Sequence, residues 1–167
     1  MKNITTVILA AGRSTRFISS KSKLTHELAG YPIISHVFDS AKKISENIIV
    51  VCNKDNYPEL KNILIGCKLV IQKNQKGTAD AIEVAKQHIK TENFIILFGD
   101  VPLITDKSLK KLIRSFKNNN TASMIAFKTH KPKGYGRVVI NNNKVTKVVE
   151  EINTSANEKI IELCNSG

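Results

Sequence analysis

Long apolar runs are missing from this sequence, and cysteines are few. No run of apolar residues is long enough for a transmembrane helix, so the sequence predicts no membrane-spanning segment. The first apolar run passes directly into a charged loop, which does not match the layout of a signal peptide. The three cysteines (Cys52, Cys67 and Cys164) are widely spaced and form no metal-ligand pattern. We therefore expect reduced thiols in a cytoplasmic protein without a membrane partner.

Aromatic and acidic residues are also scarce. Aromatic residues make up 5% of the chain, and 14 acidic residues face 26 basic ones, giving a net charge of +12. Such a charge favours anionic partners. Nucleic acid and phosphorylated small molecules are the candidate partners that the charge suggests, and a compositional bias toward lysine, isoleucine and asparagine is the stronger explanation of the charge. No basic stretch is interleaved with aromatic residues as in nucleic-acid-binding proteins, so we expect no nucleic-acid partner. The length of 167 residues and a hydrophobic content of 41% predict one globular domain over residues 1–167.

Hydrophobic periodicity predicts alternating strands and helices through the first two thirds of the chain. The predicted strands are residues 4–9, 47–52, 68–71, 94–98, 122–127, 138–140, 144–149 and 160–164. Helices are expected to begin at Pro32, to cover residues 57–64, and to follow Thr78 and Thr105 as N-caps. The helix after Thr78 is expected to bury Ile82, Ala85 and Ile89.

This alternation predicts the fold class. It is typical of an α/β protein with a mostly parallel, mixed sheet and helices on both faces, in three layers. Three asparagines at residues 141–143 separate the strands at 138–140 and 144–149, and they predict a hairpin turn.

A loop rich in small residues follows the first predicted strand. Leu9 leads into Ala10, Ala11 and Gly12, and the basic residue Arg16 comes shortly after. Small residues let a ligand approach the backbone closely, and successive N–H groups with nearby arginines can hold phosphate oxygens. The loop matches neither the dinucleotide-binding fingerprint nor a Walker A loop. A simple strand-to-helix turn is the alternative interpretation.

Other polar residues are expected at the same edge of the sheet, because ligands bind beyond the carboxyl ends of parallel strands. Asp100 follows the strand at 94–98 and could hold Mg²⁺ beside phosphates, or serve as a turn residue. Lys23 could reach a phosphate or stay solvated. Gln72 and Thr78 could hydrogen-bond a base or sugar, or only satisfy the loop. Glu150 ends a later strand and could bind a sugar hydroxyl or remain exposed.

The ordered set of these motifs resembles a known family. The segment from Leu9 to Gly12, with Thr15-Arg16 and Lys23, resembles the signature of sugar-phosphate nucleotidyltransferases. Further stretches are similar to the uridyltransferase domain of bacterial bifunctional N-acetylglucosamine-1-phosphate uridyltransferases that also carry a glucosamine-1-phosphate acetyltransferase. These stretches are Gln72, residues 76–79, 98–103, 134–137, 148–151 and 165–167.

The resemblance implies a Rossmann-like nucleotidyltransferase fold and a set of roles. The expected reaction joins UTP and N-acetylglucosamine 1-phosphate with the help of Mg²⁺ and releases pyrophosphate. Expected nucleotide contacts are Leu9, Ala10, Ala11, Gly12, Gln72, Gly77 and Thr78, of which the last three surround uracil. Arg16 and Lys23 are the expected phosphate-binding catalytic residues, and Asp100 is the expected metal ligand. The N-acetylglucosamine group is expected at Gly136, Glu150 and Asn165.

Three departures from the family pattern set further expectations. Ser22 replaces the usual proline before the lysine, and Ile152-Asn153 replaces a usual Lys-Asp pair. The sequence ends at Gly167, before the family's second metal-ligating asparagine and its acetyltransferase domain. We therefore expect no acetyl transfer, weak or absent turnover, and a homo-oligomer or complementing chain that covers the last strand. The alternatives are transfer to another sugar phosphate or a cofactor alcohol, and a non-catalytic nucleotide-binding protein.

Overall fold

The structure, a computed structural model, describes residues 3–12, 19, 21–75, 77–119 and 122–166. The chain divides into two compact units, Met1–Lys110 and Lys111–Gly167, here called unit 1 and unit 2. Unit 1 contains a parallel sheet, and unit 2 contains an antiparallel sheet. No helix in the described ranges is both long enough and apolar enough to cross a bilayer.

The parallel sheet of unit 1 has four strands. They are β1 (Ile4–Leu9), β4 (Asn47–Cys52), β5 (Lys68–Ile71) and β6 (Asn93–Phe98), in the order β5-β4-β1-β6. β1 lies in the interior of the sheet, where Val7 pairs with Ile49 on one side and Ile96 on the other. Strands buried on both faces need continuous apolar runs, which is the pattern that made these strands predictable.

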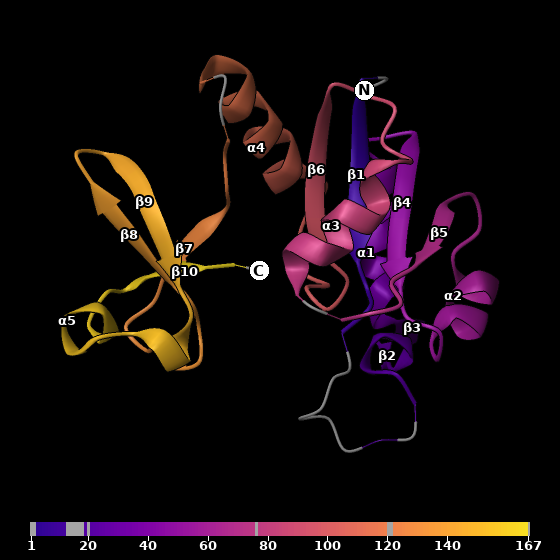
Figure 1. The fold of residues 1–167 in the computed structure, drawn as a ribbon, viewed down its shortest axis with the longest axis horizontal. Helices are drawn as coiled ribbons and strands as arrows, with labels where there is room; N and C mark the ends of the chain where they lie inside the picture. The colour runs from indigo at the N-terminus through magenta and orange to yellow at the C-terminus, as the bar shows by residue number, and fades with distance from the viewer. Residues whose placement is uncertain (1–2, 13–18, 20, 76, 120–121, 167) are drawn as a thin grey trace. The chain divides into compact units, whose positions relative to one another are not determined.

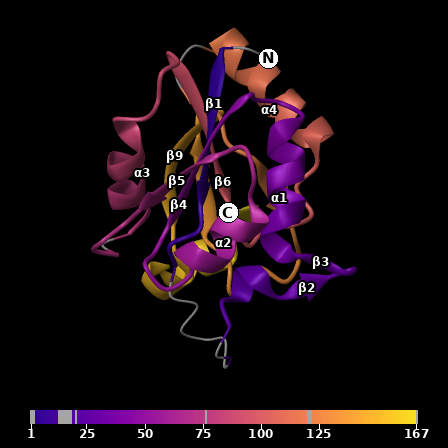
Figure 2. The same ribbon diagram turned by 90° about the vertical axis from the view of Figure 1, so that its right-hand side faces the viewer.

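Helices cover both faces of this sheet. Figures 1 and 2 show α1 (Ile33–Lys42) on one face and α3 (Thr78–Lys86) on the other, and a shorter helix, α2 (Tyr57–Ile63), follows β4. The predicted three-layer α/β arrangement is therefore confirmed within unit 1. A fourth helix, α4 (Asp106–Asn119), begins after the Thr105 cap, whose Oγ1 accepts the Ser108 N–H at 3.2 Å as predicted.

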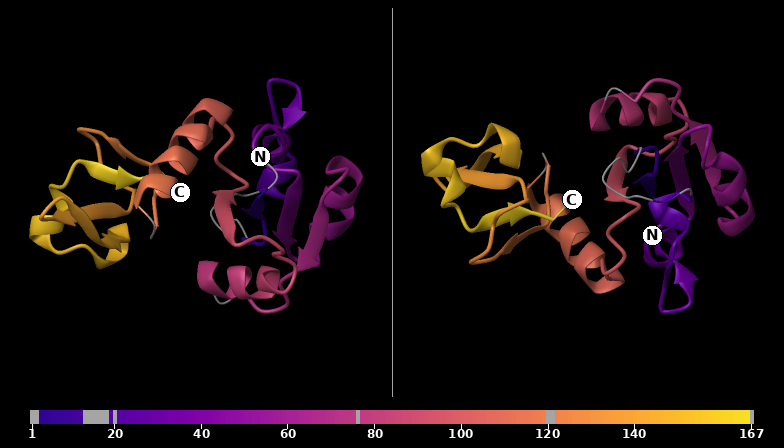
Figure 3. Two further views of the ribbon diagram at one scale, coloured as in Figure 1. Left: turned by 90° about the horizontal axis from the view of Figure 1, so that it is seen from above. Right: turned by 90° about the horizontal axis from the view of Figure 1, so that it is seen from below.

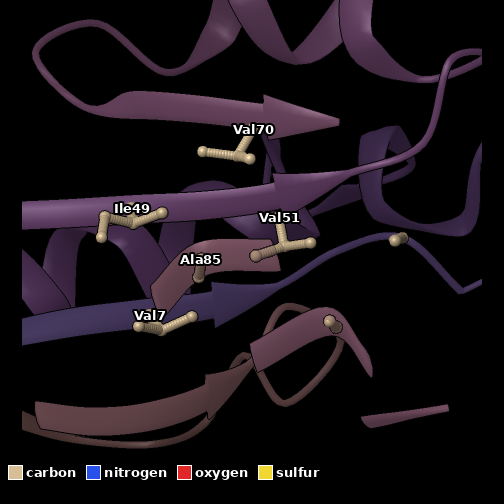
Figure 4. Close-up of a cluster of buried hydrophobic side chains, with 7 residues drawn as sticks. Val7, Ile49, Val51, Val70 and Ala85 are labelled. Carbon is tan, nitrogen blue, oxygen red and sulfur yellow. The ribbon is translucent and has the colours of Figure 1, made fainter. Parts of the chain in front are cut away.

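Alternating side chains of each strand point to opposite faces, so the sheet has two apolar layers. The layer beneath α3 is a cluster of Val7, Ile49, Val51, Val70 and Ala85 together with Ala11 and Ala81 (Figure 4). Full burial of each such aliphatic side chain contributes about 1.5–3 kcal/mol. This packing fixes the carboxyl ends of β1, β4 and β5 beside the start of α3.

Two helix starts differ from the sequence-based prediction. Pro32 lies in a small hairpin, where β3 (Tyr31–Pro32) pairs with β2 (Glu27–Leu28), and α1 begins one residue later. Thr78 is the first residue of α3 and not its cap; Gly77 occupies the cap position with φ 118°. Only glycine adopts such a dihedral without strain, so the cap is a backbone requirement.

The buried face of α3 was also predicted only in part. Ala81 and Ala85 are buried, and Val84 and Ile89 pack against the same core. Ile82, which we expected to be buried, is partly exposed. The helix ends at Lys86, so Ile89 reaches the core from the segment that follows it.

Unit 2 is built from antiparallel strands, coloured orange to yellow in Figure 3. They are β7 (Ala126–Lys128), β8 (Arg137–Asn141), β9 (Lys144–Val149) and β10 (Leu163–Asn165), in the order β7-β10-β8-β9. The hairpin turn is confirmed: Asn142 and Asn143 have φ 49° and 60°, as a type I′ turn requires. These strands form their own sheet, so the parallel and antiparallel strands of the predicted mixed sheet belong to separate sheets.

Two strands of unit 2 have different bounds from those predicted. The strand expected at 122–127 covers only Ala126–Lys128, where it pairs with β10. The strand expected at 160–164 begins at Leu163, where its pairing with β7 begins. A helix, α5 (Ala156–Lys159), ends just before this segment and follows a short 3-10 helix, η2 (Glu151–Asn153). Ser155 and Glu158 form a reciprocal capping box that holds α5, and Ile160 is its C-cap.

Candidate nucleotide site

A cavity of about 440 Å³ lies in unit 1 at the carboxyl ends of β1, β5 and β6. This is the edge at which parallel α/β sheets bind ligands. Its lining includes most of the residues that the sequence placed there, and these are Leu9, Ala10, Ala11, Gly12, Gln72, Gly77, Thr78 and Asp100. Leu24, Gln75, Ala81 and Phe98 complete the lining.

The small-residue loop leaves β1 in a fixed conformation. The Ala10 N–H donates to the Val51 carbonyl at 2.7 Å, which continues the pairing of β1 with β4 for one residue. Ala10 and Ala11 are buried, whereas Gly12 is exposed. Among the described residues other than its chain neighbours, none has an atom within 4 Å of the position a Gly12 Cβ would take. The space beside Gly12 is therefore open for a ligand to approach the backbone.

Three amide side chains hold the carbonyls of this loop. Asn56 Nδ2 donates to the Ala10 carbonyl at 2.8 Å, and Asn53 Nδ2 donates to the Ala11 carbonyl at 3.2 Å. Gln75 Nε2 also donates to the Ala11 carbonyl, at 2.8 Å. Sequence reasoning missed Asn53 and Asn56, although polar residues directly after the buried strand β4 were a signal.

Gln72 lines the cavity and also donates hydrogen bonds within the protein. It is 4% exposed, and its Nε2 donates to Asp80 Oδ2 at 2.6 Å and to the Gly77 carbonyl at 3.4 Å. Both contacts hold the first turn of α3 beside β5. Thr78 opens that helix at the cavity, where the first N–H groups of a helix lack partners within the helix. Uracil recognition by Gln72 and Thr78 stays a prediction.

Lys23 and Asp100, 77 positions apart in the chain, meet at the cavity. Lys23 Nζ donates to Asp100 Oδ2 at 3.0 Å, and their side chains are 37% and 44% exposed. An ion pair this exposed stabilises the protein by only about 0–1 kcal/mol. Lys23 and Asp100 can therefore each leave the other and bind a ligand instead. The predicted phosphate-binding residue and the predicted metal ligand are thus placed together.

Ser22 explains how the chain keeps this geometry without the family's proline. Its φ is −57°, close to the value of about −65° that proline imposes. The Ser22 hydroxyl accepts the Leu24 N–H at 3.4 Å and caps the 3-10 helix η1 (Lys23–Thr25). The departure from the family pattern therefore preserves the backbone that presents Lys23.

Asp100 fits a Mg²⁺ ion that is shared with phosphates. Across the described ranges, no group of three or more His, Cys, Asp or Glu side chains could hold a metal by itself. Magnesium is commonly held by one or two carboxylates, with phosphate oxygens and water completing its shell. One exposed carboxylate at the cavity matches that donor set. Arg16, the other predicted phosphate-binding residue, lies outside the described residues.

In unit 2, two of the three predicted sugar-binding residues are neighbours. The Asn165 N–H donates to the Gly136 carbonyl at 2.8 Å, and a Cβ on Gly136 would lie 3.7 Å from the Asn165 Cβ. Glu150 follows β9 directly and is exposed at the start of η2. The backbone thus brings Gly136 and Asn165 together, and sugar binding by the three residues stays a prediction.

A buried ion pair that the sequence did not predict fixes the backbone around Gly136. The Arg137 side chain is 2% exposed, and its Nη1 lies 2.7 Å from Glu151 Oε2. Glu151 also accepts the Gly134 N–H at 3.2 Å. The hydrogen bond from Arg137 is the main reason that the pKa of Glu151 is lowered. Both residues belong to the motifs that carried the resemblance, but their pairing requires the folded hairpin.

The remaining titratable groups of note are thiols. Cys52 and Cys164 are buried and Cys67 is partly buried, and all three are free. Burial raises the pKa of Cys52 to about 11 and also raises that of Cys67. Both thiols therefore stay protonated near neutral pH, which argues against a nucleophilic role.

Comparison with known proteins agrees with this geometry. The bifunctional protein GlmU of Campylobacter fetus subsp. fetus is 38% identical over 175 residues, covering 100% of this chain and 39% of that protein. GlmU of Buchnera aphidicola subsp. Schizaphis graminum is 38% identical over 169 residues, covering 99% of this chain and 36% of that protein. The chain thus spans less than half the length of these relatives, and the resemblance read from its motifs is confirmed.

A solved structure shows the same fold. UDP-glucose pyrophosphorylase complexed with UDP-glucose superposes with a TM-score of 0.77 at 18% identity, covering 98% of this chain and 74% of that one. The predicted nucleotidyltransferase fold is therefore confirmed. The family described as the MobA-like NTP transferase domain matches residues 6–162, which is most of the sequence. The chain belongs to the MobA-like NTP transferase domain family.

Proposed function

We propose that this domain joins UTP and N-acetylglucosamine 1-phosphate to give UDP-N-acetylglucosamine and pyrophosphate. The observation that carries the proposal is the cavity at the sheet edge, where the loop after β1, the start of α3 and the Lys23–Asp100 pair meet. Similarity to GlmU proteins over the whole chain supports this sugar and this base over others.

The reaction asks for little covalent chemistry from the protein. An oxygen of the sugar phosphate forms a bond to the α-phosphorus of UTP, the bond from that phosphorus to the bridging oxygen breaks, and pyrophosphate leaves. Catalysis then depends on positioning the two reactants and on neutralising the charge on the phosphates. Lys23 would neutralise phosphate charge, together with Arg16. Asp100 would hold Mg²⁺, which supplies further neutralisation when bound.

Each unit has its own part in the proposal. In unit 1, the loop at residues 10–12 would contact the nucleotide, through the Ala11 and Gly12 N–H groups among others, and Gln72 and Thr78 would contact uracil. In unit 2, Gly136, Glu150 and Asn165 would contact the N-acetylglucosamine group. The support is that the first set lines one cavity and that Gly136 and Asn165 are hydrogen-bonded neighbours.

The test is pyrophosphate release by the purified chain with Mg²⁺, UTP and N-acetylglucosamine 1-phosphate, combined with calorimetric binding of UDP-N-acetylglucosamine. Release that needs both substrates, and tighter binding of this product than of UDP-glucose, support the proposal. Faster release with glucose 1-phosphate would instead indicate transfer to another sugar phosphate. Binding of UTP with no release from any sugar phosphate would favour a non-catalytic nucleotide-binding protein.

A further inference from the structure

Two buried asparagines donate hydrogen bonds to the loop after β1. We infer that Asn53 and Asn56 are positioning residues, which turn the two peptide groups joining residues 10–12 so that the Ala11 and Gly12 N–H groups face the bound nucleotide. This inference rests on the proposed function of the cavity. Asn53 and Asn56 are 8% and 3% exposed, and neither belongs to the cavity lining.

The two asparagines hold each other in place. The Asn53 N–H donates to Asn56 Oδ1 at 3.0 Å, and the Asn56 N–H donates to Asn53 Oδ1 at 2.9 Å. Each amide oxygen is thereby occupied, which fixes the orientation of each side chain and directs its NH₂ group toward the loop after β1. The carbonyls of Ala10 and Ala11 accept these NH₂ groups.

A simpler role as helix caps does not account for these contacts. Asn56 occupies the N-cap position of α2, where an asparagine side chain usually accepts an N–H of its own helix. Here the side chain makes no such bond, and its NH₂ group donates across 46 positions to the Ala10 carbonyl. The side chain therefore serves the loop after β1 and not the start of α2.

Peptide planarity converts these carbonyl contacts into an orientation of N–H groups. The Ala10 carbonyl and the Ala11 N–H belong to one planar trans peptide and point in opposite directions. The same holds for the Ala11 carbonyl and the Gly12 N–H. Asparagines that capture both carbonyls from behind the loop thus direct two successive N–H groups to the other side. Residues 10–12 line the cavity, and two such N–H groups suit acceptor oxygens of a nucleotide.

The chemistry requires an amide, which makes aspartate an informative replacement. Asn56→Asp keeps the size and the acceptor oxygen but removes the donor, and it places negative charge against the Ala10 carbonyl. Asn47→Asp is the matched control, because Asn47 is exposed at the start of β4, the end of the strand that lies away from Asn53 and Asn56. Asn53→Ser is a second variant that leaves the contact between Asn56 and Ala10 in place.

The experiment measures UTP binding by calorimetry and amide hydrogen exchange at Ala11 and Gly12, with and without UTP, in the full chain. In the unsubstituted protein we expect UTP to slow exchange of both amides. Asn56→Asp should weaken UTP binding about tenfold, as expected for lost hydrogen bonds to a charged ligand, and should abolish this protection while protection at residues 72–78 persists. Asn47→Asp should behave like the unsubstituted protein.

If Asn56→Asp fails to fold, Asn53→Ser decides the matter, with reduced protection expected at Gly12 and not at Ala11. Part of the protection at Gly12 should persist, because Gln75 Nε2 still donates to the Ala11 carbonyl. Unchanged affinity and unchanged protection in a folded variant would overturn the inference but leave the proposed function standing. Absence of UTP binding by the unsubstituted protein would overturn both.

Discussion

Units 1 and 2 are stabilised by different forces. In unit 1, the inner strands β1 and β4 are almost wholly buried, and the polar groups of the candidate site are uncharged apart from the Lys23–Asp100 pair. In unit 2, nearly every residue of β9 is exposed, and carboxylates tie the segments together. The pairs are Arg137–Glu151 at 2.7 Å, Lys147–Glu158 at 2.5 Å and His130–Glu162 at 2.7 Å.

This difference shows where each unit should respond to mutation and to pH. Apolar burial is insensitive to protonation, so unit 1 should depend on the shape of its core. Ion pairs at exposed positions contribute little, and a buried pair is costly to break from one side. In unit 2, the Arg137–Glu151 pair, whose arginine side chain is 2% exposed, should therefore matter more than the Lys147–Glu158 and His130–Glu162 pairs, whose basic side chains are 57% and 93% exposed.

The largest effect is expected from Ile8→Ala in the core of unit 1. Ile8 is 0% exposed and lies between Val50 and Leu97 on the neighbouring strands. Truncation should cost about 3 kcal/mol, from lost transfer free energy and the cavity left behind. Urea unfolding measures this cost, with Ile65→Ala as control because Ile65 is 81% exposed. Equal costs for the two variants would show that unit 1 does not depend on this core.

Glu151→Gln should produce the next largest loss of stability, and it should be confined to unit 2. The substitution leaves the Arg137 guanidinium, whose side chain is 2% exposed, without its carboxylate. Faster hydrogen exchange is expected at residues 134–149, with little change in β1 and β4. Glu162→Gln is the matched control, because its partner His130 is 93% exposed. A larger effect of Glu162→Gln would reverse our ranking of the two pairs.

Lys23→Ala should weaken UTP binding about tenfold while leaving the fold intact. A charge-assisted hydrogen bond to phosphate is worth about 1.5–3 kcal/mol, whereas the Lys23–Asp100 pair is exposed enough to be lost cheaply. Calorimetry with UTP and Mg²⁺ measures the change, and Lys131→Ala, an exposed lysine outside every motif, is the control. Equal affinities of the two variants would remove Lys23 from the site.

The smallest effect is expected from Glu158→Gln, and it should depend on pH. Hydrogen bonds from Lys147, and then from Ser155, lower the pKa of Glu158 from 4.5 to about 2. A lowered pKa in the folded state stabilises the protein above pH 4.5, and this contribution disappears as the pH falls to about 2. The difference in melting temperature between the unsubstituted protein and Glu158→Gln should follow that course. Asn157→Gln, a neutral control on the same helix, should show no such trend.

The sequence predicted the parts of the molecule that depend on local pattern. Continuous apolar runs located β1, β4 and β5, and the order of elements placed Asp100 and Gln72 at one edge of the sheet. The hairpin turn was predictable because Asn142 and Asn143 tolerate positive φ.

The unpredicted features depend on contacts between distant segments. Asn56 holds a carbonyl 46 positions away, and the Lys23–Asp100 contact spans 77 positions. The start of β10 was misplaced because its pairing with β7, 35 positions away in the chain, begins only at Leu163, after the helix that the Ser155 capping box begins. The partners of Asn56 and Lys23 cannot be read from spacing, since each contact requires the folded sheet to bring the segments together, whereas the capping box has the local Ser-x-x-Glu spacing.

We propose that the cavity of unit 1 selects a uridine nucleotide, and competitive titration tests this selectivity. UTP, CTP, GTP and ATP are titrated into the full chain with Mg²⁺, while hydrogen exchange is followed at residues 9–12 and 72–78. We expect UTP to bind most tightly of the four nucleotides and to slow hydrogen exchange in both segments. Tighter binding of ATP or GTP, or UTP binding without protection of these segments, would contradict it.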